Sequence, residues 1–474
     1  MRRIIRPFVI LFSSLILTVS CLSDDSASYI YYSDTAITSF SLGTLNRTMW
    51  TKSSTGADSS YVEEIDGSDY HFYIDQAGRR IYNPDSLPVG TDAAHVICNI
   101  GSKNGGTVVI AYKDTEGADS LAYYSSSDSI DFSEPLDFRV YANDGMNFRT
   151  YKISVNVHKE DPDSFTWQRM DGMASQTFRQ FDAMKASTLG GRLIVMGRDG
   201  SATRVMISNG GAWTEGASLA DGEAWANAVV KGDSLFTISG GQIMRTADGN
   251  TWDACGQAGD LPVRLMAAGS VKLYGLDAQG RVVSSAHGGY GWTADAITGD
   301  ASMLPATGAG YGYAALKTDE TAERIIMAGN RDLSAHAEDS VAMVWSKIEE
   351  YSNAARQHSW IQCEGDAKYR LPSLTNLSVT AYGDVMLAIG GKGAGASTAE
   401  AFSKVYVSLD NGLTWAVDGS YYLPEDFTNG VSDVFAMTAD DDNFIWIICG
   451  GTGDVWRGRL NRLGWPEEQT SFTE

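Results

Sequence analysis

The last two-thirds of this 474-residue chain repeat one short pattern six times. Each copy contains an apolar run of strand length, followed by a turn rich in Ser, Thr, Asp and Gly. A tryptophan closes each turn, at Trp213, Trp252, Trp292, Trp360, Trp415 and Trp465. Short strands that recur with a period of about 40 to 45 residues are typical of β-propeller blades. Buried strands of an all-β fold are therefore expected at 192–197, 234–240, 272–276, 324–329, 385–390 and 444–450.

Two copies of the turn are well preserved. They are formed by Ser408, Asp410, Gly412, Thr414 and Trp415 in one unit and by Thr246, Asp248, Gly249, Thr251 and Trp252 in another. This spelling resembles the Asp-box hairpin of sialidase-type and Vps10-type propellers. The aspartate can accept backbone N–H bonds, the glycine supplies a positive φ, and the tryptophan packs between blades. The Asp-box is a structural hairpin, so it predicts a fold and leaves the activity open.

The propeller is predicted to occupy 165–474, with six blades or, as the alternative, seven. Leu-Pro pairs precede a new unit at 261–262, 304–305, 371–372 and 423–424. Proline cannot donate to a strand ladder, so these pairs mark crossings between blades. Radial folds often close their last blade with a strand from the other end of the chain, which removes exposed sheet edges. Residues 165–167 and Trp465 are both candidates for that strand.

The segment 31–158 alternates polar and apolar residues. Phe138 and Val140 precede the turn at 143–145, after which Tyr151 and Ile153 fall on one face with period two. This pattern predicts an antiparallel hairpin with an Asp-Gly turn. It resembles the last two strands of cadherin-like or Ig-like domains of bacterial surface proteins, which implies a β-sandwich. Residues 159–164 are polar and are expected to be a linker.

The first 20 residues have the layout of an export signal, with arginines before an apolar run at 8–19. That run is shorter than the roughly 20 residues of a membrane-spanning helix. A small residue followed by Cys21 resembles the lipobox of bacterial lipoproteins, which implies that Cys21 is lipidated and that 21–30 is an acidic tether. An ordinary cleaved secretory signal is the alternative.

The formal net charge of −23 argues against a nucleic-acid partner, since phosphate binding needs clustered Lys and Arg. The same charge disfavours adsorption to anionic lipid, so the membrane is expected to be reached through the lipid anchor only. The remaining cysteines are Cys98, Cys255, Cys363 and Cys449. They have no CxxC spacing, so they predict neither a zinc nor a redox site, and buried free thiols or one disulfide remain open.

The propeller sequence contains several candidate sets of catalytic residues. The sialidase resemblance implies three arginines around a carboxylate, and Arg179, Arg264 and Arg370 lie near the starts of separate units. However, no Arg-Ile-Pro motif or paired Tyr and Glu accompanies them. Glycosidase carboxylates at 221 and 223 or at 338 and 339, and a calcium cluster at 440–443, are no better supported than surface or hairpin residues. No catalytic residue, cofactor or metal site is therefore predicted.

Binding is the less demanding hypothesis. Aromatic faces beside polar side chains suit sugar rings or a partner protein. The predicted ligand-binding residues are Arg179, Trp225, Arg264, Tyr311, Arg370, Tyr421 and Tyr422. The whole arrangement resembles a family of Bacteroidetes surface lipoproteins, which implies a non-catalytic lipoprotein that binds or scaffolds glycan or protein at the outer membrane. A sialidase-like glycoside hydrolase or lyase is the alternative, and a structural assembly factor is a third.

Overall fold

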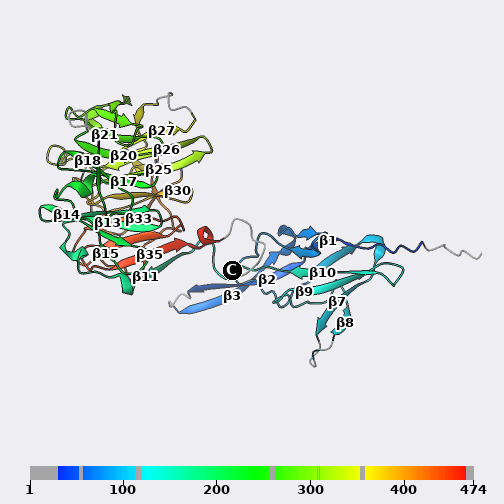
Figure 1. Cartoon of the computed structure of the whole chain (residues 1–474). Coiled ribbons are helices and arrows are strands. Elements are labelled where there is room, and N and C mark those ends of the chain that lie inside the picture. Colours follow the sequence, from blue (N-terminus) through cyan, green and yellow to red (C-terminus); the bar gives the residue numbers. More distant parts are fainter. Residues whose placement is uncertain are drawn as a thin grey trace, which may run out of the picture. The chain divides into compact units, whose positions relative to one another are not determined.

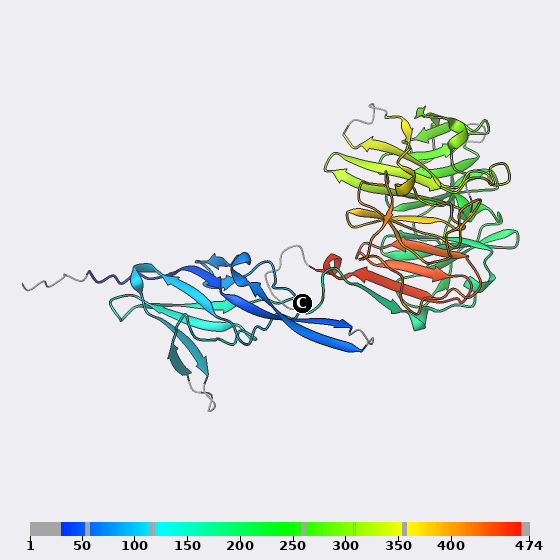
Figure 2. The same cartoon turned by 180° about the vertical axis from the view of Figure 1, so that it is seen from behind.

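The computed structural model describes residues 30–52, 57–113, 117, 119–256, 262–306, 308, 310–352 and 358–465. These residues fall into two compact units, one ending at Lys159 and the other spanning Glu160–Pro466 (Figures 1 and 2). The regular elements of the described residues are strands and short 3-10 helices. The predicted signal at 1–20 and Cys21 lie outside the described residues, as does most of the tether.

The N-terminal unit contains three sheets. Its elements are β1 (Ile37–Leu42), β2 (Thr44–Lys52), β3 (Asp58–Asp66), η1 (Gly67–Asp69), β4 (Tyr73–Asp75), β5 (Arg80–Tyr82), β6 (Cys98–Ser102), η2 (Lys103–Gly105), β7 (Val108–Lys113), β8 (Asp119–Tyr123), β9 (Leu136–Tyr141) and β10 (Phe148–Ser154). The largest sheet has the order β4-β5-β10-β9-β7-β8, and its β5–β10 pair is parallel. The other two sheets are the pairs β1–β6 and β2–β3.

The hairpin predicted in this unit is formed by β9 and β10. Tyr151 lies opposite Phe138, and both side chains are fully buried in the core. Between the strands, Asp144 Oδ1 accepts the N–H groups of Met146 and Asn147, while Gly145 has a φ of +71°. The polar turn and the alternating apolar residues therefore set the register of the hairpin together.

The described residues of the second unit form six sheets, in which all strand pairs but one are antiparallel. Apart from β11, each sheet is made of strands that are consecutive in the sequence. The first sheet contains β12 (Ala183–Leu189), β13 (Arg192–Asp199), β14 (Ala202–Ser208) and β15 (Thr214–Glu215), and the second contains β16 (Val229–Lys231), β17 (Ser234–Ser239), β18 (Gln242–Thr246) and β19 (Asp253–Cys255). The third sheet contains β20 (Arg264–Ala268), β21 (Leu273–Leu276), β22 (Val282–Ser285) and β23 (Thr293–Ala294), and the fourth contains β24 (Ile297–Thr298), β25 (Tyr311–Asp319), β26 (Ala322–Gly329), β27 (Met343–Glu350) and β28 (Trp360–Gln362). The fifth sheet contains β29 (Ser378–Tyr382), β30 (Val385–Ile389), β31 (Tyr406–Ser408) and β32 (Ala416–Val417), and the sixth contains β33 (Phe435–Ala439), β34 (Ile445–Cys449), β35 (Val455–Leu460) and β11 (Phe165–Arg169). In the fourth sheet, β24 joins β28 in parallel.

The first strand of each antiparallel meander, which is β25 in the fourth sheet, contacts the corresponding strands of the two neighbouring sheets, so that the six strands form a closed cycle. β12 contacts β16, and the cycle continues through β20, β25, β29 and β33 back to β12. The apolar runs of the repeat form the second strands β13, β17, β21, β26, β30 and β34. Each residue of β30 is buried, because a blade packs against its neighbours on both faces. This is the β-propeller arrangement that the sequence predicts.

The ring is closed by a strand from the start of the unit. β11 pairs antiparallel with β35, with Phe165 opposite Leu460, and the blue-green β11 lies beside the red β35 in Figure 1. Trp167 Nε1 donates to Tyr422 O at 2.7 Å. Residues 165–167 thus take the closing position, whereas Trp465 follows the 3-10 helix η8 (Asn461–Gly464). The pairing covers a sheet edge that would otherwise be open.

The well-preserved turn of the fifth sheet is held by its aspartate. Asp410 Oδ1 accepts the backbone N–H groups of Leu413 and Thr414, and Asp410 Oδ2 accepts the Thr414 hydroxyl at 2.7 Å. Gly412 has a φ of +90°, and a Cβ there would lie 2.6 Å from Ile326 Cγ2 of the preceding sheet. Trp415 is 2% exposed and packs beside Ile326 in the same cluster. The turn therefore joins two neighbouring sheets.

The turn at 246–252 repeats this geometry. Asp248 Oδ1 accepts the N–H groups of Asn250 and Thr251, and Gly249 packs against Ile207 of the preceding sheet. Trp252 Nε1 donates to Ala217 O at 2.9 Å. The four described cysteines are free thiols.

Candidate functional site

The first strands of the six sheets surround a cavity of about 320 Å³. Small side chains such as Ala186 and Ala314 leave this space open, and four aromatic residues also line it. Those aromatic residues are Trp225, Tyr311, Tyr313 and Phe435. The cavity is the place where the propeller brings together residues that lie far apart in the sequence.

Lys185, the third residue of β12, lines the cavity and remains partly exposed. Its Nζ donates to Ala226 O at 2.9 Å and lies 5.2 Å from the centre of the Tyr311 ring. Burial among the inner strands, together with the neighbouring charge of Arg264, lowers the pKa of Lys185 to about 7. No ion pair joins Lys185 to a carboxylate among the residues that the structure describes.

Arg264, the first residue of β20, is a second cation beside this cavity. Its Nε and Nη2 atoms are buried and have no hydrogen-bond partner in the structure. Burial lowers the pKa of Arg264 to about 10. Buried donors without an acceptor typically cost about 1 to 3 kcal/mol each. Two cations thus lie near each other, and no described carboxylate forms an ion pair with either.

The inner strands carry few acidic residues. Asp319, the last residue of β25, accepts the N–H of Thr321 and stays at the end of its strand. Asp441 also lines the cavity, but it follows β33 and lies past the strand ends, where Thr188 Oγ1 donates to Ala439 O. Lys185 is three residues before Thr188, which is about 10 Å along a strand. The cavity therefore has a basic end and an acidic end.

The tyrosines of β25 tie the inner strands together. Tyr311 is buried and its hydroxyl donates to Met266 O, while Tyr313 Oη accepts the N–H of Val230 at 2.7 Å. Burial raises the pKa of Tyr311 and raises that of Tyr313 to about 12. Both phenols consequently stay neutral near pH 7, and their hydroxyls are engaged with the backbone.

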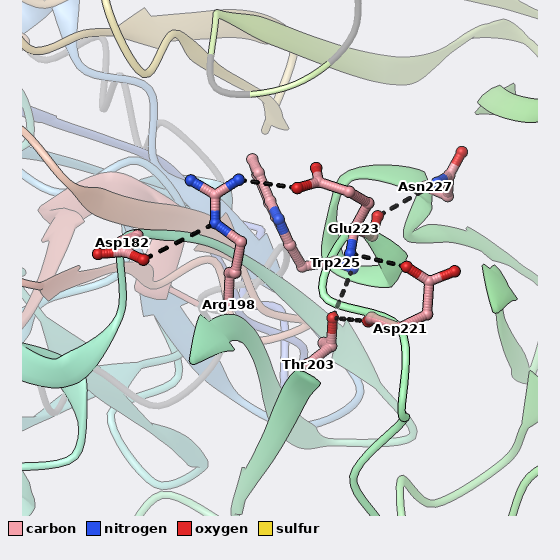
Figure 3. Close-up of polar contacts among 7 residues, drawn as sticks. All are labelled: Asp182, Arg198, Thr203, Asp221, Glu223, Trp225 and Asn227. Atoms are coloured by element: carbon pink, nitrogen blue, oxygen red, sulfur yellow. Dashed lines mark hydrogen bonds and ion pairs between the residues drawn. The ribbon is translucent and has the colours of Figure 1, made fainter. Parts of the chain in front are cut away.

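Trp225 belongs to η5 (Ala224–Asn227), which Figure 3 shows held by a small polar network. Thr203 Oγ1 donates to Asp221 O at 2.7 Å and accepts the N–H of Trp225 at 3.3 Å. The indole is 3% exposed, and its buried Nε1 has no hydrogen-bond partner. η5 also supplies the Ala226 carbonyl that receives Lys185. The network therefore positions both an aromatic wall and the lysine.

The carboxylate pairs considered from the sequence have structural partners. Asp221 accepts the N–H groups of Glu223 and Gly240, and Glu223 pairs with Arg198 at 2.8 Å (Figure 3). Asp339 receives Arg331 through two hydrogen bonds of 2.7 and 2.8 Å. These bonds hold loops and strand ends in place, so we find no free acid and base in either pair.

A third pair of carboxylates converges and was not recognised in the sequence. Glu323 of β26 lies directly opposite Glu349 of β27, and both are buried. Burial, with the adjacent Glu323, raises the pKa of Glu349 to about 7. Glu349 accepts the Tyr274 hydroxyl and the Val271 N–H, each at 2.6 Å. The two carboxylates thus bind the backbone N–H groups of the turn between β20 and β21. Neither glutamate is among the residues that line the central cavity.

The other predicted ligand-binding arginines hold loops. Arg179, in η4 (Phe178–Gln180), donates from Nε to Thr452 O at 2.7 Å. Arg370, which follows η7 (Ala367–Tyr369), donates from Nε to Gly365 O at 2.8 Å. Arg264, by contrast, lies beside Lys185. The three arginines share no partner, so the arrangement that a sialidase resemblance implies is not assembled by these contacts.

The two predicted tyrosines at 421 and 422 anchor the closing strand. Tyr421 is buried against Phe165, and Tyr422 Oη donates to Phe165 O at 3.0 Å. Both tyrosines therefore pack β11, while Tyr422 remains 44% exposed, and their predicted role in ligand binding stays a prediction. Substituting both to test ligand binding would loosen the ring closure at the same time.

The acidic run at 440–443 forms a hairpin tip. Asp440 Oδ1 accepts the N–H groups of Asp442 and Phe444, and its Oδ2 accepts Trp446 Nε1 at 2.6 Å. Asn443 has a φ of +59°, as the turn requires. Within the described part of the chain, no group of three or more His, Cys, Asp or Glu is placed to hold a metal ion.

Comparison with protein families assigns both units. Residues 161–468 match the DUF6242 beta propeller domain. Residues 40–155 match the DUF6242 N-terminal domain, which is a domain of unknown function. The chain belongs to the DUF6242 family. No curated protein matches this DUF6242 chain.

Several solved structures are weakly similar to the DUF6242 chain. A carbohydrate-active enzyme of family AA12 from Trichoderma reesei is 10% identical, covering 63% of this chain and 96% of that one, with a TM-score of 0.37. The α-L-arabinofuranosidase Arb93A from Fusarium graminearum is 12% identical over 61% and 95%, with a TM-score of 0.35. The Trypanosoma rangeli sialidase is 12% identical over 60% and 55%, with a TM-score of 0.32. Likenesses this weak carry no argument about activity.

In the part of the DUF6242 chain that the structure describes, no helix is long and apolar enough to cross a membrane.

Proposed function

We propose that this chain is a non-catalytic cell-surface lipoprotein whose propeller binds or scaffolds a glycan or a protein at the outer membrane. The observation that carries the proposal is the central cavity, where Lys185 and Arg264 stand beside aromatic walls without a carboxylate partner. Side chains that are costly for folding and open to a cavity are typical of binding sites.

In this proposal each of the six sheets is one blade, and the N-terminal unit is an Ig-like or cadherin-like sandwich. Lipidated Cys21 provides the membrane attachment. The net charge of −23 supports this division of roles, because an acidic protein is repelled by anionic headgroups and needs acyl chains to stay at the surface.

A glycoside hydrolase or lyase is the second candidate, and one observation favours it. Glu323 and Glu349 converge, and the pKa of Glu349 is raised to about 7, as in a general acid. Against it, both side chains are buried and bond to the turn at Gly269–Lys272 of the neighbouring sheet. Binding in the cavity therefore accounts for more of the structure than catalysis at this pair.

The test is a glycan-array and hydrolysis screen of the soluble chain that starts after Cys21, with captured surface proteins examined in parallel. Binding of a glycan or a defined protein without turnover supports the proposal. Turnover of any glycan contradicts it. The Glu349→Gln variant then shows whether the buried pair is responsible, since loss of that turnover would establish the hydrolase alternative.

A further inference from the structure

The basic end of the cavity indicates the chemical class of the ligand. We propose that the propeller binds the carboxylate group of an acidic sugar, with Lys185 contacting the carboxylate and Arg264 adding its charge beside it. This inference rests on the proposed binding function and names the ligand class for the same cavity.

The first support is the charge balance of the site. Lys185 Nζ carries three donors, of which one goes to Ala226 O, and the ammonium also faces the Tyr311 ring. Arg264 is close enough to depress the pKa of Lys185, and it has two buried donors without an acceptor. Two adjacent cations repel each other, and a carboxylate between or beside them removes that repulsion.

The second support is the shape and lining of the cavity. Its volume of about 320 Å³ is at the lower end of the range for small-ligand pockets, which is roughly 300 to 1,000 Å³. Tyr313 is a partly exposed aromatic residue of the lining, whereas Trp225 and Tyr311 are buried, and the Tyr313 ring supplies apolar surface that suits the face of a sugar ring. A carboxylate at Lys185 and a ring against the aromatic wall together describe a monosaccharide acid.

The third support is the position of the acidic end. Asp441 lines the cavity beyond the end of β33, whereas Lys185 lies near the start of β12. An anion is therefore attracted to one end and repelled from the other, which fixes its orientation. The net charge of the whole chain is strongly negative, but such distant charges are screened over about 8 Å at physiological salt.

The pH dependence of binding follows from the groups that face Lys185. These are Arg264 from β20 and the neutral phenols Tyr311 and Tyr313 from β25, with the Ala226 carbonyl from η5. A carboxylate binds the protonated lysine, so affinity falls as pH rises above about 7. Between pH 6 and pH 8.5 the loss is expected to be roughly 30-fold.

The experiment measures binding of sodium glucuronate to the soluble chain by calorimetry, with glucose as the neutral probe. Lys185→Met removes the proposed contact. Lys231→Met is the matched control, because it removes the same charge from the last residue of β16, another inner strand. We expect glucuronate to bind at pH 6, glucose to bind at least tenfold more weakly, Lys185→Met to lose about tenfold or more, and Lys231→Met to stay within about twofold.

Equal binding of glucuronate and glucose, no glucuronate binding, or equal losses in both lysine variants would overturn the inference. The proposed function is tested separately by repeating the glycan array and protein capture with Lys185→Met. A ligand that Lys185→Met retains at wild-type affinity refutes the carboxylate inference and leaves the binding function standing. Absence of any ligand for the wild-type chain refutes the binding function itself.

Discussion

The turn at 408–415 and the cavity around Lys185 differ in whether their buried polar groups have hydrogen-bond partners. In the turn, the carboxylate of Asp410 accepts four N–H or O–H donors of the chain, and Trp415 is buried with its Nε1 bonded to Gly412 O. In the cavity, the donors of Arg264 and the Nε1 of Trp225 are buried without acceptors. The turn is built for stability, whereas the cavity retains groups that stability does not favour.

This contrast separates the residues that stabilise the propeller from those that we propose to bind a ligand. The repeat that is most visible in the sequence is the one that holds neighbouring sheets together. The residues that point to a ligand belong to the inner strands, which vary in sequence from blade to blade. The predictions below test this division, beginning with the largest expected effect.

Trp415→Ala should destabilise the propeller by about 3 to 5 kcal/mol, because it leaves a cavity in a closely packed cluster between two sheets. Urea unfolding followed by circular dichroism measures the change. Tyr290→Ala, at an exposed position of another turn, is the control and should change stability by less than about 0.5 kcal/mol. A loss below about 1 kcal/mol for Trp415→Ala would show that the turn does not join the sheets.

Asp410→Ala should cost about 2 kcal/mol, since it removes the acceptor of two backbone N–H groups and two hydroxyls. Burial alone would raise the pKa of Asp410, but the hydrogen bonds from Thr414 and Ser408 outweigh it and lower that pKa. The carboxylate therefore contributes stability above its unfolded pKa, near pH 4, and this contribution is lost as pH falls further.

The measurement is urea unfolding of the wild type and Asp410→Ala at pH 7 and at pH 3. The difference between them should shrink at the lower pH. Asp233→Ala, at an exposed turn position, should show no such difference. A pH-independent cost for Asp410→Ala would mean that the ionised carboxylate is not the stabilising group.

Lys185→Met should have the opposite sign and stabilise the fold by about 1 to 2 kcal/mol, because a largely desolvated cation without a described carboxylate partner costs more than an apolar side chain. The folded pKa of Lys185 is about 7 and its usual value is 10.5. The unfolded chain therefore binds more protons between these values, so wild-type stability rises with pH across that window. The gain from Lys185→Met should accordingly be larger at pH 6 than at pH 9.5, as urea midpoints at the two pH values will show.

Tyr422→Phe is expected to have the smallest effect, about 0.5 to 1 kcal/mol, since it removes one hydrogen bond to Phe165 O at the closing strand. Hydrogen exchange of the β11 amides is the sensitive readout. Faster exchange confined to β11 and its partner β35 supports the anchoring role. Unchanged exchange in β11, with a lost ligand interaction, would instead support the sequence-based view of Tyr422 as a binding residue.

The sequence predicts the propeller because its signals are local. Apolar runs of strand length, the Asp-Gly turns and the tryptophans each depend on neighbours a few residues away, and residues 165–167 show their strand character in the same way. The repeated apolar runs form the second strands of the sheets, whereas the choice of β11 over Trp465 as the closing strand is seen only in its pairing with β35.

The cavity was harder to predict because its properties arise from packing between distant strands. Lys185 in β12 resembles a surface lysine in the sequence, and its lowered pKa depends on burial among the inner strands and then on Arg264, in a sheet two places along the ring. The opposed pair of Glu323 and Glu349 likewise depends on strand register. Tyr421 resembles an exposed loop aromatic in the sequence but is buried against Phe165 of β11, whereas Tyr422 stays 44% exposed and bonds to Phe165 O.

The central claim, that the turns provide stability and the cavity provides binding, is tested most directly by one variant with two readouts. Lys185→Met should raise the urea midpoint at pH 6 and weaken glucuronate binding by about tenfold or more in the same preparation. A variant that is less stable than the wild type, or that binds glucuronate as tightly, would contradict the account.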